Sequence, residues 1–398
     1  MIIWLNSNNP SSRERKVTGQ YQSAVSVLAN EGLVLTTMAN LGTKGLFTGF
    51  GSPKYFMTTQ PLCPVFGECG GCAYQDIPYE EELRRKEKFV RDLLGTDPRI
   101  DPDRFEPIVA SPKPYHYRNR LDLKFIRTRD ERVLLGFTPR SGRGIVPVGS
   151  CAIAEKTISD FIPALEKHLA EKSPVNYRRA NIVVRTGDDA KVLWGGIGKR
   201  SCRLDPDDYF WTDLDGKKIF YSLDTFFQAN LSILPKLFER LRTFDCWQTK
   251  PVLYDLYAGV GLFSLGLTGQ TRKSILIEES LPSVKLAEHN VTHNRLTHME
   301  ILAGRMEDIL PPLLARENSE TPKVAIIDPP RAGLSPRALE TLVHTEKFTH
   351  LFYLSCNPKA LARDLNGFIE HGWKIERIVP FDFFPKTRHV ETLALLTP

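Results

Sequence analysis

The sequence lacks any segment that is long and apolar enough to enter a membrane. Across its 398 residues, no apolar run approaches the roughly 20 residues that a membrane-spanning helix needs. The first five residues are apolar, but they have no basic start and lead directly into a polar stretch, which is not the pattern of a secretory signal. Internal repeats and low-complexity segments are absent as well. We therefore expect no membrane partner.

Cysteine is scarce, and its number is odd. Seven cysteines in a chain of this length argue against a disulfide scaffold and for a reducing compartment. A cytoplasmic location is therefore expected. Two of the seven, Cys202 and Cys246, stand alone in the sequence and are expected to be ordinary packing residues.

An excess of charge of one sign is also missing. The 53 Lys and Arg residues against 47 Asp and Glu residues leave a net charge of +6. Hydrophobic residues make up 41% and aromatic residues 10% of the chain, which is enough for ordinary buried cores and excludes a disordered or fibrous protein. At about 150 residues per domain, the length predicts two or three domains.

Three of the cysteines lie within one short, glycine-rich stretch. Glycines permit the tight turns that would bring Cys63, Cys69 and Cys72 to one point. A set of three or four thiolates selects zinc or an iron–sulfur cluster, and Cys151 is the best candidate for a fourth ligand. Zinc sites usually contain two Cys-x-x-Cys pairs, whereas only Cys69 and Cys72 form one. This favours a structural [4Fe–4S] cluster without excluding zinc.

Periodicity predicts a change of architecture along the chain. Residues 79–94 have the spacing of an amphipathic helix that ends at Gly95. Residues 100–225 are strand-like and interrupted by glycine and proline. After about residue 245, short apolar runs alternate with helical segments, as in a parallel sheet covered on both faces by helices. These runs are 252–254, 275–277, 324–327 and 351–354.

A glycine-rich turn follows the first of these runs. Asp255 leads into Gly259 and Gly261, and folds of this kind bind their ligand at the carboxyl end of the first strand. The second run ends at Glu278, which is placed to accept hydrogen bonds from ribose hydroxyls. The third glycine of the dinucleotide motif is missing, because position 264 is serine. The turn therefore favours S-adenosylmethionine over NAD.

The last two apolar runs end in reactive side chains. Asp328 precedes two prolines at the end of the third run, and Cys356 lies between polar residues at the end of the fourth. Prolines stiffen a turn, and a rigid turn at this edge of a sheet is a good position for a nucleophile. The setting favours Cys356 as a nucleophile over a buried structural cysteine. His389 and Glu391 follow at alternate positions before a final short strand, 393–396.

Taken together, these motifs resemble the RNA uridine-5-methyltransferase family. The resemblance covers nearly all of residues 61–398, and so many ordered motifs make a chance similarity very improbable. The matching segments are Cys63 to Cys72, Phe226 to Asn230, Asp255 to Gly261, Asp328 to Arg331, Ser355 to Pro358 and Phe384 to Glu391.

The resemblance implies a covalent mechanism. Cys356 would add to carbon 6 of uracil, carbon 5 would take the methyl group of S-adenosylmethionine, and Glu391 would then remove the proton from carbon 5. The target uridine would have to leave its stack. The implied cofactor-contacting residues are Gln228, Tyr257, Gly259, Gly261, Leu262, Glu278, Arg305 and Asp328. The implied ligands of a [4Fe–4S] centre, in preference to zinc, are Cys63, Cys69, Cys72 and Cys151.

Three features depart from the family pattern. Leu262 occupies a position where several relatives place a small or amide residue, so that a cofactor contact there could come from the backbone. Arg305 occupies an often acidic or amide position that faces the adenine of the cofactor. Residues 1–60 show no clear match to the small RNA-binding barrel of many relatives, so this barrel is absent, shortened or divergent.

Basic and aromatic residues between positions 111 and 150 support an RNA partner. Nine basic residues stand there against three acidic ones, with four aromatic residues between them. Such a mixture suits phosphate contacts and base stacking, although a solvated strand face would also be basic. The basic residues are Lys113, Arg118, Arg120, Lys124, Arg127, Arg129, Arg132, Arg140 and Arg143, and the aromatic ones are Tyr115, Tyr117, Phe125 and Phe137.

The predicted fold class is α/β, with a Rossmann-like methyltransferase domain at 241–398. A central β-rich RNA-recognition domain at 96–240 would supply Cys151, and 61–95 would form the cluster loop and a linking helix. Residues 1–60 would form a separate N-terminal segment. We expect a monomer that methylates ribosomal RNA of the large subunit, with transfer RNA as the alternative.

Two rival functions are less well supported by the residues. A DNA cytosine-5-methyltransferase normally carries its nucleophile after a proline, whereas Cys356 follows Ser355. A non-catalytic RNA-binding protein would not need Cys356, Asp328 and Glu391 together.

Overall fold

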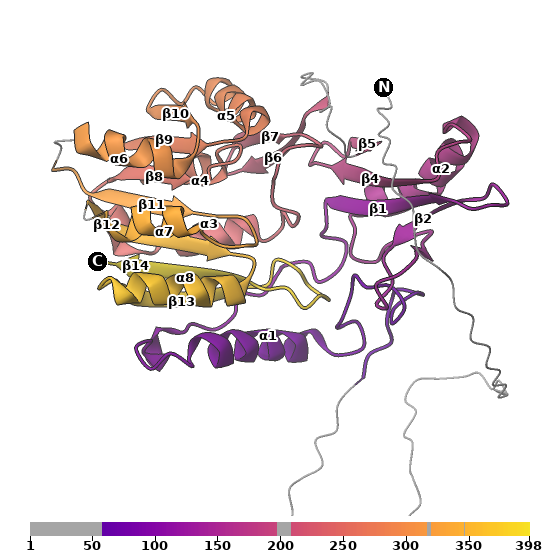
Figure 1. Cartoon of the computed structure of the whole chain (residues 1–398), viewed down its shortest axis with the longest axis horizontal. Coiled ribbons are helices and arrows are strands. Elements are labelled where there is room, and N and C mark those ends of the chain that lie inside the picture. Colours follow the sequence, from indigo (N-terminus) through magenta and orange to yellow (C-terminus); the bar gives the residue numbers. More distant parts are fainter. Residues whose placement is uncertain (1–57, 197–207, 317–319, 346) are drawn as a thin grey trace, which may run out of the picture. The chain divides into compact units, whose positions relative to one another are not determined.

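The computed structural model describes residues 58–196, 208–316, 320–345 and 347–398, and all of them belong to one compact unit (Figure 1). The expected N-terminal segment, residues 1–60, lies almost wholly outside the described residues, as does Cys202. Within the described residues, no helix is both long and apolar enough to cross a membrane.

A seven-stranded sheet forms the C-terminal part of the chain. Its order is β10-β9-β8-β11-β12-β14-β13, with the first five strands parallel and β14 antiparallel to both neighbours. The chain builds the sheet outward from β8 in one direction and then from β11 in the other, so the two strands flank the switch point where such folds bind ligands. The strands are β8 (Val252–Leu256), β9 (Lys273–Glu278), β10 (Met299–Ala303), β11 (Lys323–Ile327), β12 (Phe348–Ser355), β13 (Lys374–Phe381) and β14 (Glu391–Thr397).

Two apolar cores cover the two faces of this sheet. Successive residues of β11 alternate between them, since Val324 and Ile326 belong to one core while Ala325 and Ile327 belong to the other. Both faces are therefore buried, which explains why the central strands are continuous apolar runs. The helices of this part of the chain are α3 (Leu234–Arg242), α4 (Leu262–Gly266), α5 (Leu281–His293), α6 (Met306–Arg316), α7 (Pro336–Val343) and α8 (Pro358–Glu370).

The helix α1 (Tyr79–Leu94) packs against the same core, although it lies far away in sequence. Val90 and Leu94 are buried beside residues of α8, and the helix ends at Gly95, as its spacing predicts. The hairpin of β6 (Phe210–Leu214) and β7 (Lys217–Tyr221) joins the other core. The core of the sheet thus begins ahead of the domain boundary predicted at 241.

A second, five-stranded antiparallel sheet is formed by the middle of the chain. Its order is β3-β2-β1-β4-β5, and α2 (Lys156–Lys172) covers one face. In β1, buried and more exposed residues alternate, as expected of a strand with one solvated face. Its strands are β1 (Arg120–Arg127), β2 (Val133–Phe137), β3 (Val146–Pro147), β4 (Arg179–Thr186) and β5 (Val192–Gly196).

The α/β class and the parallel sheet predicted from the sequence are confirmed. Each of the four apolar runs is a strand of the seven-stranded sheet, and the final run 393–396 is the centre of β14. Because β14 is antiparallel to β12, its first residue lies at the edge where β12 ends. The order of the strands therefore decides which reactive side chains meet.

Candidate active site

Cys356 and Glu391 meet at the end of the β12–β14 ladder. The antiparallel register pairs Leu351 with Leu396 and continues to Ser355 opposite Thr392. Cys356 directly follows Ser355, Glu391 directly precedes Thr392 as the first residue of β14, and the negative charge of Glu391 raises the pKa of the Cys356 thiol. A thiol and a carboxyl group that are 35 positions apart in sequence are thus neighbours across two strands.

Glu391 is buried, and its environment favours the protonated form. The side chain is 3% exposed, and its Oε2 atom has no hydrogen-bond partner among the described residues. Burial raises the pKa of Glu391 well above its usual range, and the charge of Asp328 adds to this effect, while Arg331 opposes it. A buried carboxyl group without a partner is costly, so its presence at a strand end points to a chemical role.

Cys356 lies where β12 passes into α8. Asn357 caps this helix, because its side chain accepts a hydrogen bond from the backbone N–H of Lys359 (3.2 Å), and its Nδ2 donates to the Arg331 carbonyl (2.9 Å). These contacts fix the turn that carries the thiol. Burial, followed by the charges of Glu391 and Asp328, raises the pKa of Cys356 to about 11, and Arg331 acts in the opposite direction.

Asp328 lies at the end of β11, beside the ends of β8 and β12. Gln228 Nε2 donates a hydrogen bond to Asp328 Oδ2 (3.2 Å). Burial and the charge of Asp255 raise the pKa of Asp328 to about 7. Asp255, on β8, has a pKa raised to about 7 by burial, although Ser264 donates to its Oδ2 from both N–H (3.0 Å) and Oγ (2.7 Å). Two carboxyl groups therefore flank the switch point of the sheet.

The glycine-rich turn after β8 is held by Glu278 at the end of β9. Its two carboxylate oxygens accept hydrogen bonds from the backbone N–H groups of Gly259 (2.8 Å) and Ser280 (2.7 Å). Gly259 and Gly261 both have positive φ, +56° and +91°. A Cβ atom at Gly261 would lie 2.9 Å from Leu265 Cδ1, whereas one at Gly259 would meet nothing within 4 Å. The backbone is thus open at Gly259.

The remaining predicted cofactor residues lie around this turn in different ways. Tyr257 has a φ of +65°, and burial, followed by the charge of Glu307, raises its pKa. Leu262 begins α4 with its side chain buried in the core, so only its backbone can contact a ligand. Arg305 follows β10, which pairs with β9, and its exposed guanidinium lies 3.4 Å from the carboxylate of Glu279. Seven of the eight residues lie at or near the carboxyl ends of β8, β9, β10 and β11, and Gln228 joins them through its hydrogen bond to Asp328.

The loop between β13 and β14 is held by buried charges on α1. Lys86 Nζ donates to Glu82 Oε1 (2.8 Å), to Asp382 Oδ1 (2.7 Å) and to the Phe384 carbonyl (3.0 Å). The backbone N–H of Lys386 donates to Glu82 Oε1 (2.6 Å). Lys86, Glu82 and Asp382 are all at most 2% exposed. This network fixes the loop that leads into Glu391.

The same loop contacts the segment that follows the cysteine-rich stretch. The backbone N–H groups of Ala73 and Tyr74 donate to the Lys386 carbonyl at 2.7 and 3.1 Å, and Lys386 has a left-handed φ of +66°. Tyr117, from the segment before β1, donates its hydroxyl to the Pro385 carbonyl (2.9 Å). The cysteine-rich stretch and the Glu391 loop therefore share one set of hydrogen bonds.

All four cysteines predicted as ligands line one cavity. Cys63, Cys69, Cys72 and Cys151 surround a space of about 160 Å³, together with Gln75 and several apolar side chains. Burial raises the pKa of Cys72 to about 12, and the charges of the other three cysteines act in the same direction. The contacts that hold Cys72 include a hydrogen bond from Arg140 Nη2 to its carbonyl (2.7 Å).

The four thiols do not have the close spacing of ligands already arranged around one metal ion. Four sulfur ligands of a tetrahedral zinc ion lie about 3.8 Å apart, given Zn–S bonds of about 2.3 Å. Among the described residues, no three of the cysteine sulfurs all lie within 4.8 Å of one another. As a donor set, four thiols can hold zinc or an iron–sulfur cluster.

The basic stretch between 111 and 150 is less available to RNA than its sequence indicates. Arg127 is buried and donates to Ser173, and Arg120 pairs with Asp122. Tyr117 and Phe125 are fully buried, so neither ring can stack on a base, and the expectation of stacking is wrong for them. The basic residues that do remain exposed are Lys113, Arg129, Arg132, Arg140 and Arg143.

Several residues of the site had no role assigned from the sequence. Arg331 lowers the pKa values of both Cys356 and Glu391. An arginine after two prolines does not by itself indicate this role in the sequence. Phe226 is 66% exposed and stands two residues before Gln228. The ion network of α1 involves pairs about 300 positions apart, so no local pattern could have revealed it.

Comparisons with known proteins agree with this geometry. A family model described as tRNA (Uracil-5-)-methyltransferase matches residues 207–398. An uncharacterized RNA methyltransferase of Clostridium tetani is 30% identical over 382 residues, which cover 83% of this chain and 82% of the relative. Another, of Caldanaerobacter subterraneus, is 30% identical over 385 residues, or 84% of each chain.

A solved structure shares the fold of most of the chain. The tRNA (uracil-54, C5)-methyltransferase of Pyrococcus abyssi, crystallised with S-adenosyl-L-homocysteine, superposes with a TM-score of 0.63 at 24% identity. The likeness covers 83% of this chain and 86% of the archaeal one. It includes more than the seven-stranded sheet alone.

Proposed function

The chain belongs to the family of S-adenosylmethionine-dependent RNA (uracil-5-)-methyltransferases, and from this premise we propose that it acts through a covalent adduct between Cys356 and one uridine. The observation that carries the proposal is the β12–β14 register, which pairs Ser355 with Thr392 and so brings the adjoining residues Cys356 and Glu391 to the same end of the ladder. A thiol and a carboxyl group on facing strand ends can act on carbons 6 and 5 of one base, because these carbons are directly bonded.

Each step of the proposed reaction uses a group at this edge of the sheet. The Cys356 thiolate forms a bond to carbon 6, and the electrons of the 5,6 double bond move onto carbon 5 and the neighbouring carbonyl. S-adenosylmethionine supplies a methyl group on a positively charged sulfur. After carbon 5 has taken this group, the Glu391 carboxylate removes its proton, the double bond forms again and the Cys356 thiolate leaves.

The raised pKa suits Glu391 as a base, whereas Cys356 needs neighbours that favour its thiolate. A carboxylate with a high pKa is a stronger base, so burial of Glu391 favours removal of a carbon-bound proton once the group is ionised. Cys356 must lose its proton before it can attack, and its pKa of about 11 reflects burial near two acidic groups. Arg331 lies against the thiol and favours the thiolate. A cationic sulfonium bound nearby would act in the same direction.

The residues around the switch point would hold the cofactor. The backbone at Gly259 is open to a ligand, and both carboxylate oxygens of Glu278 still have lone pairs that can accept hydrogen bonds. Gln228 and Asp328 form a hydrogen-bonded pair at the same switch point. Tyr257, Gly261, the backbone of Leu262 and Arg305 complete the set. Phe226, which is largely exposed next to this set, is suited to stack on an unstacked base.

Removal of the thiol tests the proposal directly. The Cys356→Ala variant should transfer no labelled methyl group from the cofactor to RNA, while its affinity for the cofactor should stay within about threefold of the wild type, because the glycine-rich turn is unchanged. Cys246→Ala is the matched control, since this cysteine is buried in the apolar core, and it should retain transfer. Undiminished transfer by Cys356→Ala would disprove the nucleophile assignment.

We further propose a [4Fe–4S] cluster on Cys63, Cys69, Cys72 and Cys151. The four thiols line one cavity, and the resemblance to family members with a [4Fe–4S] centre supports iron over zinc. Bound iron would stabilise the thiolate forms of Cys69, Cys72 and Cys151, whose pKa values are otherwise raised by burial. Such a cluster would act as a structural tie between residues 63–72 and Cys151.

Metal analysis decides this part of the proposal. Protein purified without oxygen should contain about four iron atoms and four acid-labile sulfides per chain. Cys72→Ser should lose them, and Cys246→Ala should keep them. Zinc in place of iron, or no metal at all, would contradict the cluster.

For the target we propose ribosomal RNA of the large subunit. The resemblance to cluster-bearing family members that act on ribosomal RNA supports this choice. Transfer RNA is the second candidate, because the matching family model and the archaeal structure both carry the name of a transfer RNA enzyme. Mapping 5-methyluridine in both RNAs of a strain without the gene decides between them, since one position should lose its methyl group. We also propose a monomeric, cytoplasmic enzyme.

A further inference from the structure

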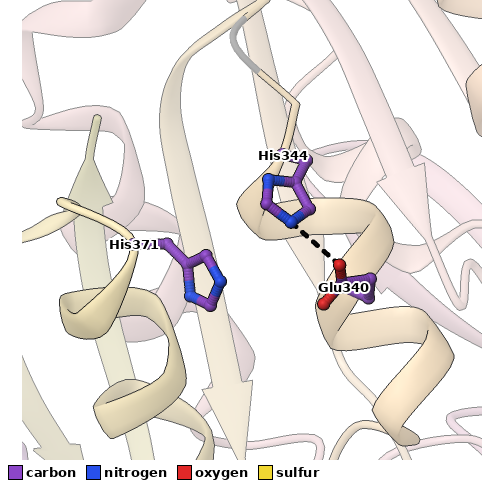
Figure 2. A group of neighbouring side chains, drawn as sticks. All are labelled: Glu340, His344 and His371. Atoms are coloured by element: carbon purple, nitrogen blue, oxygen red, sulfur yellow. Dashed lines mark hydrogen bonds and ion pairs between the residues drawn. The ribbon is translucent and has the colours of Figure 1, made fainter.

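Three exposed side chains with metal-binding atoms converge at the ends of α7 and α8. Glu340 lies in α7, His344 is the C-cap of the same helix, and His371 is the C-cap of α8. Figure 2 shows the three side chains facing one another from these two elements. One ligand atom from each lies within 4.8 Å of the others, and no other described group of three or more His, Cys, Asp or Glu side chains meets this criterion.

The two residues of α7 are spaced as a helical metal-binding pair. Glu340 and His344 are four positions apart and therefore lie on one face of the helix. Their side chains are already in contact, since His344 Nε2 lies 2.9 Å from Glu340 Oε1. A nitrogen and an oxygen at this distance can be adjacent ligands of one ion, with the ion in place of the shared proton.

His371 is oriented by its own helix in the form that a metal requires. Its Nδ1 lies 2.8 Å from the Gly367 carbonyl, and because a carbonyl only accepts, Nδ1 carries the proton. The lone pair of the neutral ring is therefore on Nε2. A histidine whose second nitrogen donates to a carbonyl is the usual arrangement at metal sites, because it fixes both the tautomer and the ring. The two histidine rings are 5.1 Å apart, edge to face.

We propose that Glu340, His344 and His371 bind one divalent transition-metal ion of the zinc type. Two imidazole nitrogens and one carboxylate oxygen suit Zn²⁺, Co²⁺, Ni²⁺ or Cu²⁺, whereas Mg²⁺ and Ca²⁺ prefer oxygen ligands alone. Water would complete the coordination, because the three side chains are exposed. The site is separate from the cysteine cavity in both its ligands and its chemistry.

The position of the site assigns it a structural role. His344 precedes β12 and His371 precedes β13, so both lie at the edge of the sheet where these strands begin. Cys356 lies beyond the other end of β12, and an eight-residue strand spans about 26 Å. The ion therefore takes no part in methyl transfer. It ties the end of α7 to the end of α8, and both helices cover the same core.

Cobalt binding to the full chain tests the proposal. Co²⁺ is the probe because thiolate ligands give it intense near-ultraviolet charge-transfer bands, which imidazole and carboxylate ligands do not. Wild-type protein with its cysteines intact should bind one Co²⁺ that is lost in Glu340→Gln, His344→Ala and His371→Ala. His168→Ala is the control, since His168 is an exposed histidine on α2, and it should keep this ion.

Stability and activity provide the second readout. Zn²⁺ at about a hundredfold excess over its dissociation constant should raise the melting temperature of the wild type by a few degrees, and this rise should vanish in the three variants. Methyl transfer should be the same in all of them. The proposal is overturned if the variants bind as much Co²⁺ as the wild type, or if the lost ion shows thiolate charge-transfer bands.

Discussion

At the scale of single residues, burial and neighbouring negative charges define the site around Cys356 and Glu391. Glu391 and Asp328 both raise the pKa of Cys356, and Asp328 raises that of Glu391, after burial as the larger cause in each case. The free protein thus favours the neutral forms of Cys356 and Glu391. Arg331 lowers the pKa of both Cys356 and Glu391. Of the four, Glu391 is the most costly to bury, since one of its oxygens has no described partner.

The Glu391→Gln variant separates the two halves of the proposed reaction. An amide of the same size cannot remove the proton from carbon 5, so Cys356 should remain bonded to the methylated base. We expect turnover to fall by about a hundredfold or more, with a protein–RNA adduct visible in denaturing gels. The double variant with Cys356→Ala should show no adduct. An adduct formed by the double variant would exclude Cys356 as its source.

Alanine substitutions at the two glycines of the glycine-rich turn after β8 should change the stability of the protein by different amounts. Gly261→Ala places a Cβ atom 2.9 Å from Leu265 Cδ1 and 3.0 Å from Leu276 Cδ2 at a φ of +91°, so it should lower the free energy of unfolding by more than about 2 kcal/mol. Gly259→Ala meets no protein atom, and the cost of its φ alone is about 1 kcal/mol. Urea denaturation measures both values.

Cofactor affinity completes this comparison. Because the backbone at Gly259 is open, a Cβ atom there should weaken cofactor binding more than it weakens the fold. Equilibrium dialysis with labelled cofactor measures the affinity. If Gly259→Ala binds the cofactor like the wild type, the cofactor does not lie against this residue.

At the scale of elements, the helix α1 acts as a support for the loop between β13 and β14. Lys86 and Glu82 occupy one face of this helix, four positions apart, and both bond to the loop. Buried ion pairs add little net stability compared with apolar packing, but together with their hydrogen bonds they can specify one geometry. Here that geometry places the residues that lead into Glu391. The network is therefore best understood as a positioning device.

Loss of one partner from this network should be severe. Lys86→Met leaves Glu82 and Asp382 buried without their shared cation, so the free energy of unfolding should fall by about 3–5 kcal/mol. Lys88→Met is the matched control on the same helix, because its pair with Asp92 is exposed and should contribute less than about 1 kcal/mol. Equal losses in both variants would contradict the role of burial.

At the scale of the whole molecule, the cysteine cavity and the proposed catalytic edge meet at one residue. The Lys386 carbonyl accepts hydrogen bonds from Ala73 and Tyr74, which directly follow Cys72. Lys386 itself lies five positions before Glu391. Backbone hydrogen bonds thus link the cysteine-rich segment to the Glu391 loop. Through this link the proposed cluster would have an indirect influence on methyl transfer.

Removal of iron should therefore loosen the Glu391 loop. After chelation, or in Cys72→Ser, amide hydrogen exchange should accelerate in residues 384–390 and methyl transfer should fall with it, while β8 and β11 keep their protection. Cys246→Ala, which alters the apolar core instead, should leave exchange in 384–390 unchanged relative to the sheet. Unchanged exchange after complete loss of iron would show that the two regions are independent.

Local sequence patterns were sufficient to predict the helix and the strands that carry the site. The helix at 79–94 and the four apolar strands follow from spacing alone, because amphipathic and fully buried segments have distinct periods. Cys356 and Asp328 were recognisable because polar residues that end an apolar run lie at the sheet edge. The prediction that Tyr117 and Phe125 could stack on bases was wrong, because both side chains are fully buried. The basic residues near them along the chain gave no sign of this burial.

The sequence by itself determined the α/β class, the candidate reactive residues and the membership of the methyltransferase family, because motifs and periodicities are local properties of a chain. The tertiary structure alone decided which of these residues lie at the same edge. The antiparallel insertion of β14 beside β12 places Glu391 at the edge where β12 ends before Cys356, and α1 brings two buried charges to a loop about 300 positions away. Such pairings depend on strand order and helix packing, which no local pattern encodes.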